Sequence, residues 1–404
     1  MAVRGTPSWL GDQNAALALG NLLEHGPQSR NGIGTLTGLS KQTAAQIVAR
    51  LEERGLIHAV GEEAATRGPS ATVYGVRNDT MYGVAVNIDQ QGVQSVVVDV
   101  LGNSLPVARE TAAGLDGERS AARDVASAVI RACRLAEIDL AAVKHVNIGV
   151  PSSVDPRSDE LSSVEALPGW SRKSVRRQIE DALGCEVRVD NDVNLAAVAE
   201  RRSGAFEQDA ILALFWVGYG IGLALDIGGT VLHGASGGAG EIGHLPVARA
   251  LLGAAGENTD LEDLIGAVAL ERLARELGEN EFTFEGMLAG AALPVRVIEA
   301  LAPRLALSVI PVLGVIDPDE VVLGGPVGRA GGAQLAELTR AAIRNHTRWD
   351  PSVNVSRIAE DAVLRGARSV LLTDLRESLV AQARSTDTAE DRSRIIESNL
   401  RGIH

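Results

Sequence analysis

The same pattern of strands and glycine turns occurs twice in this chain. Residues 81–105 read as two strands joined by a tight turn, and residues 210–225 repeat a strand, a glycine turn and a strand. Helical stretches and further short strands follow each copy, for example at 143–151 and 317–326. Strands that alternate with helices are typical of α/β domains. We therefore expect a body of two similar α/β lobes on either side of a cleft.

Composition limits how these lobes can be built. Hydrophobic residues make up 45% of the 404 residues and charged residues 22%, which suits a folded chain. Aromatic residues are only 3%, so the cores must rest on Ala, Val, Leu and Ile. The two cysteines, Cys133 and Cys185, exclude a disulfide scaffold and an all-cysteine zinc site. No apolar run reaches the ~18 residues of a membrane span and the N-terminus lacks a secretory pattern, so we expect a cytoplasmic protein with no membrane partner.

Charge is distributed unevenly along the chain. The formal net charge is −14, yet residues 1–78 contain seven Lys and Arg against six Asp and Glu, a local net charge of +1. The remaining residues therefore carry −15. An acidic surface repels nucleic acid, so any DNA contact must belong to the first 78 residues. A net charge of +1 permits DNA binding without arguing for it.

The first 78 residues read as helices followed by a hairpin. The expected elements are helices over 14–25 and about 30–38, the helical segment GLSKQTAAQIVARLEERGLI at 38–57, and strands that begin at 56 and return at 73–76. In the third segment Gly38 makes the turn, Ser40 is a good N-cap, and the apolar residues follow a period of 3.6. This order predicts a winged helix-turn-helix domain over residues 1–78.

A winged helix-turn-helix places the start of its third helix in the major groove of DNA. Glutamine can read adenine through two hydrogen bonds, and lysine can bind guanine or a phosphate. A wing-tip arginine can contact the minor groove or the backbone. The residues that we expect to contact DNA are Ser40, Lys41, Gln42, Thr43, Gln46 and, at the wing tip, Arg67. The alternative is that these are ordinary solvated polar residues of a small helical domain.

Several motifs together resemble one family over nearly the whole chain. They are the segment 38–57, VDNDVNLAAVAE (189–200), HGASGGAGEIGH (233–244), LPGW (167–170) and VLGGP (322–326). The chain resembles the ROK family, and within it the transcriptional regulators with an N-terminal winged helix. The resemblance implies an actin-like, ribonuclease H-like, two-lobed sugar kinase fold and a homodimer, in some members paired into a tetramer. It also implies lobes over 79–190 and 191–404, with a C-terminal helix returning to the first lobe.

The resemblance also implies which residues bind a sugar. In family kinases the Asp of an N-D-x-N loop removes a proton from a sugar hydroxyl, and that position is Asp192 here, beside Asn191. Glu241 and His244 match sugar-contacting positions in G-E-x-G-H, and Glu262 matches a further one downstream. The alternative is that Asp192 caps the helix that starts at 193 and that Glu241 only braces its turn.

The chain departs from the family pattern at the nucleotide site. Where family kinases have the phosphate turn D-I-G-G-T, this chain has Asn87-Ile88-Asp89-Gln90-Gln91. Asp89 places a carboxylate where a phosphate would lie, and Tyr219 stands where kinases usually have threonine. The literal DIGGT at 226–230 falls where the family has a hairpin, so we interpret it as a turn. We therefore expect no ATP cofactor and no kinase activity.

The chain departs from the family at the zinc site as well. The three family cysteines are replaced by Gly253, Ala255 and Asp260, and His244 alone cannot hold zinc. We expect no metal. The loop must be held in another way, for which the candidates are Leu251, Leu252, Leu261 and Leu264 packing inward.

These observations predict a sugar-responsive transcription factor, most simply a repressor, whose dimer binds a palindromic operator. The main alternative is an active ATP-dependent sugar kinase with a fused DNA-binding head. A third is a constitutive DNA-binding protein whose body only dimerises. The charged segment 384–404 is expected to be helical. It would either carry motion from the first lobe to the heads or lie on the surface.

Overall fold

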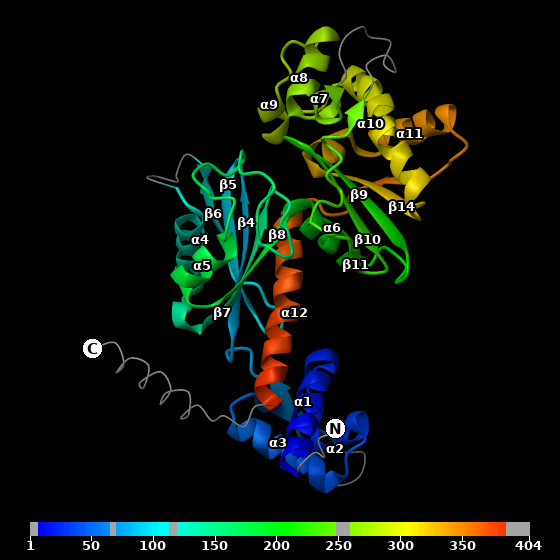
Figure 1. The fold of residues 1–404 in the computed structure, drawn as a ribbon. Helices are drawn as coiled ribbons and strands as arrows, with labels where there is room; N and C mark the ends of the chain where they lie inside the picture. The colour runs from blue at the N-terminus through cyan, green and yellow to red at the C-terminus, as the bar shows by residue number, and fades with distance from the viewer. Residues whose placement is uncertain (1–6, 65–69, 113–118, 248–258, 385–404) are drawn as a thin grey trace.

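The computed structural model describes residues 7–64, 70–112, 119–247 and 259–384, and Figure 1 shows how they are arranged. They form a small N-terminal head and a body of two α/β lobes. The predicted fold class, a winged helix-turn-helix followed by a two-lobed α/β body, is confirmed.

The head contains three helices and a three-stranded sheet. Its elements are α1 (Pro7–His25), β1 (Gln28–Ser29), α2 (Arg30–Thr37), α3 (Lys41–Glu53), β2 (Ile57–Glu63) and β3 (Ala71–Val76), and the strand order is β1-β3-β2. Ser40 caps α3, because its hydroxyl accepts a hydrogen bond from the backbone N–H of Thr43. The sequence does not predict β1, because two residues are too few to show a period.

The first lobe is a five-stranded sheet with helices on its faces. Its elements are β4 (Tyr82–Asp89), β5 (Gly92–Asp99), β6 (Ala108–Thr111), α4 (Ala121–Ala136), the short 3₁₀ helix η2 (Leu140–Ala142), β7 (Val143–Val150), α5 (Val175–Leu183) and β8 (Glu186–Asn191). The strand order is β6-β5-β4-β7-β8. Strands β4, β7 and β8 are parallel, whereas β4, β5 and β6 form antiparallel pairs.

The second lobe repeats this plan. Its strands are β9 (Ile211–Val217), β10 (Ile221–Ile227), β11 (Thr230–Val231), β14 (Glu320–Gly324) and β15 (Ser352–Val355), with the small pair β12 (Pro246–Val247) and β13 (Thr259–Asp260). Its helices are α7 (Glu262–Ile265), α8 (Ala267–Glu276), α9 (Phe284–Leu288), α10 (Val295–Val315) and α11 (Gly325–His346). The strand order β11-β10-β9-β14-β15 and the strand directions match those of the first lobe. The repetition seen in the sequence is therefore a repeated fold.

The DIGGT stretch is a hairpin turn, as expected. Asp226 pairs with Val231 and Ile227 with Thr230 across β10 and β11. The two residues between the strands, Gly228 and Gly229, have φ angles of 58° and 85°. Glycine adopts this left-handed conformation without the strain that a side chain would add.

One described helix, α10, has the length and apolar composition of a membrane span. Its apolar residues pack into the core of the second lobe with those of α8 and α11. This position is that of the core helix of a folded lobe.

Helix α6 (Asp192–Arg202) lies between the two lobes, and helix α12 (Ala362–Arg384) runs from the lobes to the head. Helix α6 follows β8 directly, and α12 packs on α6, on β4 and β7 of the first sheet, and on α1 of the head. A Cβ atom at Gly366 would lie 1.8 Å from the carbonyl oxygen of Leu195, so α12 and α6 touch through their backbones. Helix α12 returns to the first lobe, and the segment 384–404 lies outside the described residues beyond Arg384, so its expected helix stays a prediction.

The head shares a hydrophobic core with the body. Leu22, Val48 and Leu51 of the head belong to the same cluster as Leu375 and Leu379 of α12. The cluster continues to the first sheet through Ala85, Val96 and Val98. The head is therefore packed onto the body as well as linked to it by the chain.

Candidate functional site

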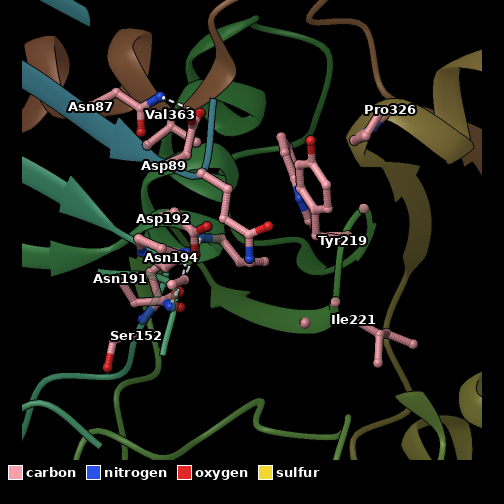
Figure 2. A pocket seen from close by; sticks show the side chains of 18 of the residues that line it. Asn87, Asp89, Ser152, Asn191, Asp192, Asn194, Tyr219, Ile221, Pro326 and Val363 are labelled. Atoms are coloured by element: carbon pink, nitrogen blue, oxygen red, sulfur yellow. Dashed lines mark hydrogen bonds between the residues drawn. The ribbon is translucent and has the colours of Figure 1, made fainter. Parts of the chain in front are cut away.

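A cleft of about 890 Å³ lies between the two lobes. Its walls come from the ends of β4 and β8, the start of α6, the turn between β9 and β10, and the start of α12. Figure 2 shows side chains from these elements around one space. The five residues predicted to bind sugar all line this cleft: Asn191, Asp192, Glu241, His244 and Glu262. Their contact with a sugar stays a prediction.

Asn191 and Asp192 are fixed at the junction of β8 and α6. Asn191 is the N-cap of α6, because its Oδ1 accepts a hydrogen bond from the backbone N–H of Asn194 at 3.0 Å. The Nδ2 of Asn191 donates to Asp192 Oδ1 at 3.1 Å, and the backbone N–H of Val193 donates to the same oxygen at 2.8 Å. Asn191, rather than Asp192, is therefore the cap of α6.

Burial controls the proton on Asp192. Burial raises the pKa of this carboxyl to about 7. The hydrogen bond from the backbone N–H of Val193 lowers the pKa, whereas the negative charges of Asp89 and Glu241 raise it further. Asp192 can therefore hold a proton near neutral pH. A protonated carboxyl both donates and accepts hydrogen bonds, so it can pair with a hydroxyl in either direction.

Glu241, His244 and Glu262 lie on the wall formed by the second lobe. Their side chains are exposed, and that of His244 is 78% accessible, with its Nδ1 4.0 Å from the carboxylate of Asp260. Partial burial raises the pKa of Glu262, and His244 opposes this effect. The backbone N–H of Glu262 donates to the carbonyl of Gly243 at 3.0 Å, which ties the two segments together. All three side chains are accessible to a ligand in the cleft.

Two buried amides other than the five predicted sugar-binding residues also line the cleft. Asn87 in β4 and Asn194 in α6 are only 7% and 5% exposed. Within the part of the chain that the structure describes, neither Oδ1 has a hydrogen-bond partner. Leaving a buried acceptor unpaired is costly, so both oxygens mark positions for a bound donor. Both positions had a signal in the sequence, because Asn194 ends the N-D-x-N motif and Asn87 begins the segment that replaces the phosphate turn.

In the turn between β4 and β5, the carboxylate of Asp89 occupies the backbone N–H groups. Asp89 Oδ1 accepts hydrogen bonds from the backbone N–H groups of Gln91 and Gly92 at 2.8 and 3.1 Å. Backbone N–H groups of such a turn are the usual donors to a phosphate. Here they are already paired with Asp89, whose own pKa is raised by burial.

Tyr219 lies on the wall opposite Asp89 (Figure 2). Its hydroxyl donates to Glu285 at 2.6 Å, and its ring lies 5.0 Å from that of Phe284. Burial, followed by Glu285, raises the pKa of Tyr219 to about 12, so the phenol stays neutral. These contacts hold the ring in place beside the cleft.

The start of α12 is held at the cleft by the first lobe. Asp361, immediately before α12, accepts hydrogen bonds from both terminal nitrogens of Arg109 at 3.2 and 2.7 Å. Gln94 Nε2 also donates to Asp361, at 3.1 Å. The Arg109 guanidinium holds the pKa of Asp361 below its ordinary value. The next residues, Ala362 and Val363, line the cleft themselves.

The other end of α12 contacts α3, the helix expected to enter the major groove and called here the recognition helix. Arg54, the C-cap residue of α3, donates hydrogen bonds to the carbonyl oxygens of Ala383 and Gln382 at 3.0 and 2.5 Å. The last carbonyls of a helix lack partners within the helix and favour a positive charge. Helix α12 therefore begins at the lining of the cleft and ends at the head. Figure 1 shows it running from the lobes to the head.

The predicted DNA-contacting residues lie at the start of α3. Lys41, Gln42 and Gln46 are exposed, and Thr43 is half-buried. The hydroxyl of Ser40 is engaged by the N–H of Thr43 at 3.2 Å and by its Oγ1 at 2.9 Å. Ser40 is therefore primarily a helix cap. Arg67 lies outside the described residues. Contact of these residues with DNA stays a prediction.

The residues at the expected zinc position do not fit a zinc ion. Among the described residues no group of three His, Cys, Asp or Glu could hold a metal. Asp260 instead accepts a hydrogen bond from the backbone N–H of Asp263 at 2.9 Å, and the β12–β13 pair closes the base of the loop. Leu261 and Leu264 are buried in the core of the second lobe, as expected, whereas Leu251 and Leu252 lie outside the described residues. Absence of zinc stays a prediction.

Comparison with known families identifies both parts of the chain. The sequence model of the ROK family matches residues 120–373, and that of the MarR family matches residues 10–68. The first match covers most of the body, and the second covers most of the head.

Individual relatives include regulators and kinases. A protein of Caldicellulosiruptor sp. named "Putative xylose repressor" is 24% identical over 388 residues, which are 90% of this chain and 96% of the relative. A crystal structure of a ROK family transcriptional regulator, described as a homologue of the E. coli MLC protein, has a TM-score of 0.67 at 20% identity and covers 93% of this chain and 99% of that one. The ROK hexokinase of Thermus thermophilus has a TM-score of 0.58 at 27% identity and covers 73% and 100%. The two regulators cover at least 90% of this chain, and the kinase covers 73% of it.

Proposed function

The chain belongs to the ROK family, and from that membership we propose that it is a sugar-responsive repressor of genes for carbohydrate uptake or catabolism. The observation that carries this proposal is α12. One end of this helix lines the cleft at Ala362 and Val363, and the other end is bound by Arg54 at the C-cap of the recognition helix. A ligand in the cleft therefore has a continuous physical path to the DNA-binding surface.

The response to sugar would work through the two helices between the lobes. Helix α6 packs on α12 and on β10 of the second lobe, and α12 packs on the first sheet and on α1. A sugar held by Asn191 and Asp192 on one wall and by Glu241 on the other would draw the lobes together. Closure would shift α6 against α12, and α12 would move the head. This is allostery only if the sugar binds one head arrangement more tightly than the other.

Operator recognition would use Lys41, Gln42 and Gln46 on the exposed start of α3. A homodimer, or a pair of dimers, would present two heads to a palindromic site. The body carries a strongly negative charge and would stay away from the DNA. We propose a cytoplasmic location, because the operator is there and the long apolar helix α10 is part of a core.

We propose that this chain has no kinase activity and needs neither ATP nor zinc. Asp89 occupies the backbone N–H groups of the turn that a phosphate would need, and its carboxylate repels a phosphate. Kinase activity remains the second candidate, because Asp192 has a pKa of about 7 and lies at the position of the family's catalytic base. An ATP-coupled assay on a panel of hexoses decides between them. Turnover that is lost in Asp192→Asn would establish a kinase.

The first test of the regulator is selection of genomic DNA fragments by the intact protein at two salt concentrations. We expect enrichment of a palindrome near transport or catabolic genes. Gln46→Ala should weaken operator binding by about 1–3 kcal/mol and relax specificity at one base pair of each half-site. The control, Gln334→Ala, removes an exposed glutamine of α11 and should change nothing. Binding that falls uniformly with salt and enriches no site would contradict the proposal.

A further inference from the structure

We propose that the effector is a neutral disaccharide, with its second ring in the half of the cleft where family kinases bind ATP. This inference rests on the proposed function and deepens it. The inner half of the cleft contains Asn191, Asp192, Glu241, His244 and Glu262. The outer half is defined here by Asn87, Gln90, Gln91, Tyr219, Val268 and Leu288, all of which line the same continuous space.

The size of the cleft favours a ligand larger than one sugar ring. Its volume of about 890 Å³ lies near the upper end of the range for drug-sized ligands, roughly 300–1,000 Å³. The inner half already contains the residues that resemble the binding site for a single sugar. The outer half adds space that a monosaccharide would leave to water.

The first-lobe wall of the outer half accepts hydrogen bonds. The amide of Asn87 is oriented by its Nδ2, which donates to Asp89 Oδ2 at 3.3 Å and to Gln94 Oε1 at 3.5 Å. Its Oδ1 is consequently the free atom, buried and without a partner among the described residues. A buried free acceptor requires a donor, and a sugar hydroxyl supplies one.

The same wall is unsuited to a phosphate. A phosphate near neutral pH presents mainly acceptor oxygens and negative charge, so it cannot satisfy Asn87 Oδ1. The N–H groups of the β4–β5 turn are paired with Asp89, and the carboxylates of Asp89 and Glu360 add repulsion. Two arginines that also line the cleft oppose this: Arg109 is paired with Asp361, and Glu360 lies close enough to Arg329 to affect its pKa. A neutral polyhydroxyl ligand fits these groups better than a sugar phosphate or a nucleotide.

The second-lobe wall of the outer half offers an aromatic and an apolar surface. Tyr219 is held by Phe284 and Glu285, so its ring is fixed before any ligand arrives. Val268, at the start of α8, is 79% exposed although it is apolar. A sugar ring has an apolar C–H face that packs on such side chains, while its hydroxyls meet the amides opposite. The two walls together match the two kinds of surface on a sugar ring.

Calorimetric titration of the full-length protein tests this assignment. The probes are xylose and glucose, the disaccharides xylobiose, cellobiose and gentiobiose, and glucose 6-phosphate. We expect at least one disaccharide to bind tenfold or more tightly than its own monosaccharide. Val268→Asp should abolish that advantage and leave monosaccharide affinity within about twofold. The control Val315→Asp changes a valine that is 81% exposed and outside the cleft, and it should have no effect.

Three outcomes would overturn the inference. They also distinguish its failure from failure of the proposed function. Equal affinity for mono- and disaccharides, unaffected by Val268→Asp, would overturn the inference alone. Binding of glucose 6-phosphate in preference to every neutral sugar would show an anion site in the outer half and would also overturn it. Binding of no sugar, with operator binding intact, would overturn both the inference and the sugar response.

Discussion

The carboxyl of Asp192 changes its protonation state near neutral pH, which makes folding stability depend on pH. Its position between Asn191 and Val193 is fixed by hydrogen bonds to one oxygen, and its pKa of about 7 follows mainly from burial. The folded state binds this proton more tightly than the unfolded chain, whose carboxyl has an ordinary value of 3.8. Stability should therefore fall as pH rises from about 4 to about 7, and the loss is complete above 7.

The substitution Asp192→Asn tests this proton. It keeps the shape of the side chain and removes its titration. We expect the variant to be more stable than the parent above pH 7, by at most about 4 kcal/mol, and to lose this advantage as pH falls toward 4. Thermal unfolding at a series of pH values measures the difference. A constant difference across the series would mean that burial does not control this carboxyl.

The residue scale also shows what the sequence could and could not predict. Motif positions such as Glu241 and His244 line the cleft, because a motif keeps its place in a fold. The sequence could not predict that Asn87 Oδ1 lacks a hydrogen-bond partner, because this depends on where Asp89 and Gln94 accept hydrogen bonds from the amide Nδ2. Whether Asp192 or Asn191 caps α6 was likewise decided by geometry that a sequence does not contain.

At the scale of elements, α12 joins parts that are far apart in the sequence. Its apolar stripe is visible in the sequence as Leu364, Leu371, Leu375 and Leu379, but its partners are not. The contact between Gly366 and Leu195 depends on a backbone approach that only the folded chain shows. Sequence patterns predicted the strands and helices near the motifs, whereas no prediction was made for residues 362–384, because the contacts of α12 are all long-range.

Loss of the bond between α12 and the recognition helix should uncouple sugar from DNA. Arg54→Ala removes the donors to Ala383 and Gln382. In the parent we expect sugar to change operator affinity by a factor of roughly 5–150, as is usual for allosteric coupling, and in the variant by less than about twofold. Operator binding with and without the effector gives both factors.

The control for this experiment is Arg340→Ala, which removes an exposed ion pair with Asp350 on the second lobe. It should keep the full response. Arg54→Lys should keep part of it, because lysine can still donate to a helix carbonyl. An Arg54→Ala variant that responds to sugar as the parent does would remove α12 from the mechanism.

At the scale of the whole molecule, the boundary between hydrophobic cores does not fall between the head and the body. The core of the second lobe is a cluster of its own, whereas the head, α12 and one face of the first sheet share another. The winged helix-turn-helix is a separate unit by sequence pattern. By packing it is part of the first lobe. Sequence periodicity identifies which residues are buried but not which elements bury them.

This division predicts which parts unfold together. Leu379→Ala truncates a fully buried leucine of α12 and should cost about 2–5 kcal/mol. Hydrogen exchange should then accelerate in the head and in α12 together, while α10 keeps its protection. The matched variant Leu270→Ala, in the core of the second lobe, should do the reverse. Equal acceleration everywhere in either variant would mean that the molecule has a single cooperative core.

The contact between Arg54 and α12 also bears on how such proteins diversify. Arg54 binds main-chain carbonyls, which every helix end presents whatever its side chains are. Drift in the sequence of α12 at this point therefore leaves the contact intact. A head that has an arginine at this position, and that keeps the apolar residues packed on α12, would inherit an existing sugar response by recombination. New target genes can in this way be acquired without a new sensor having to evolve.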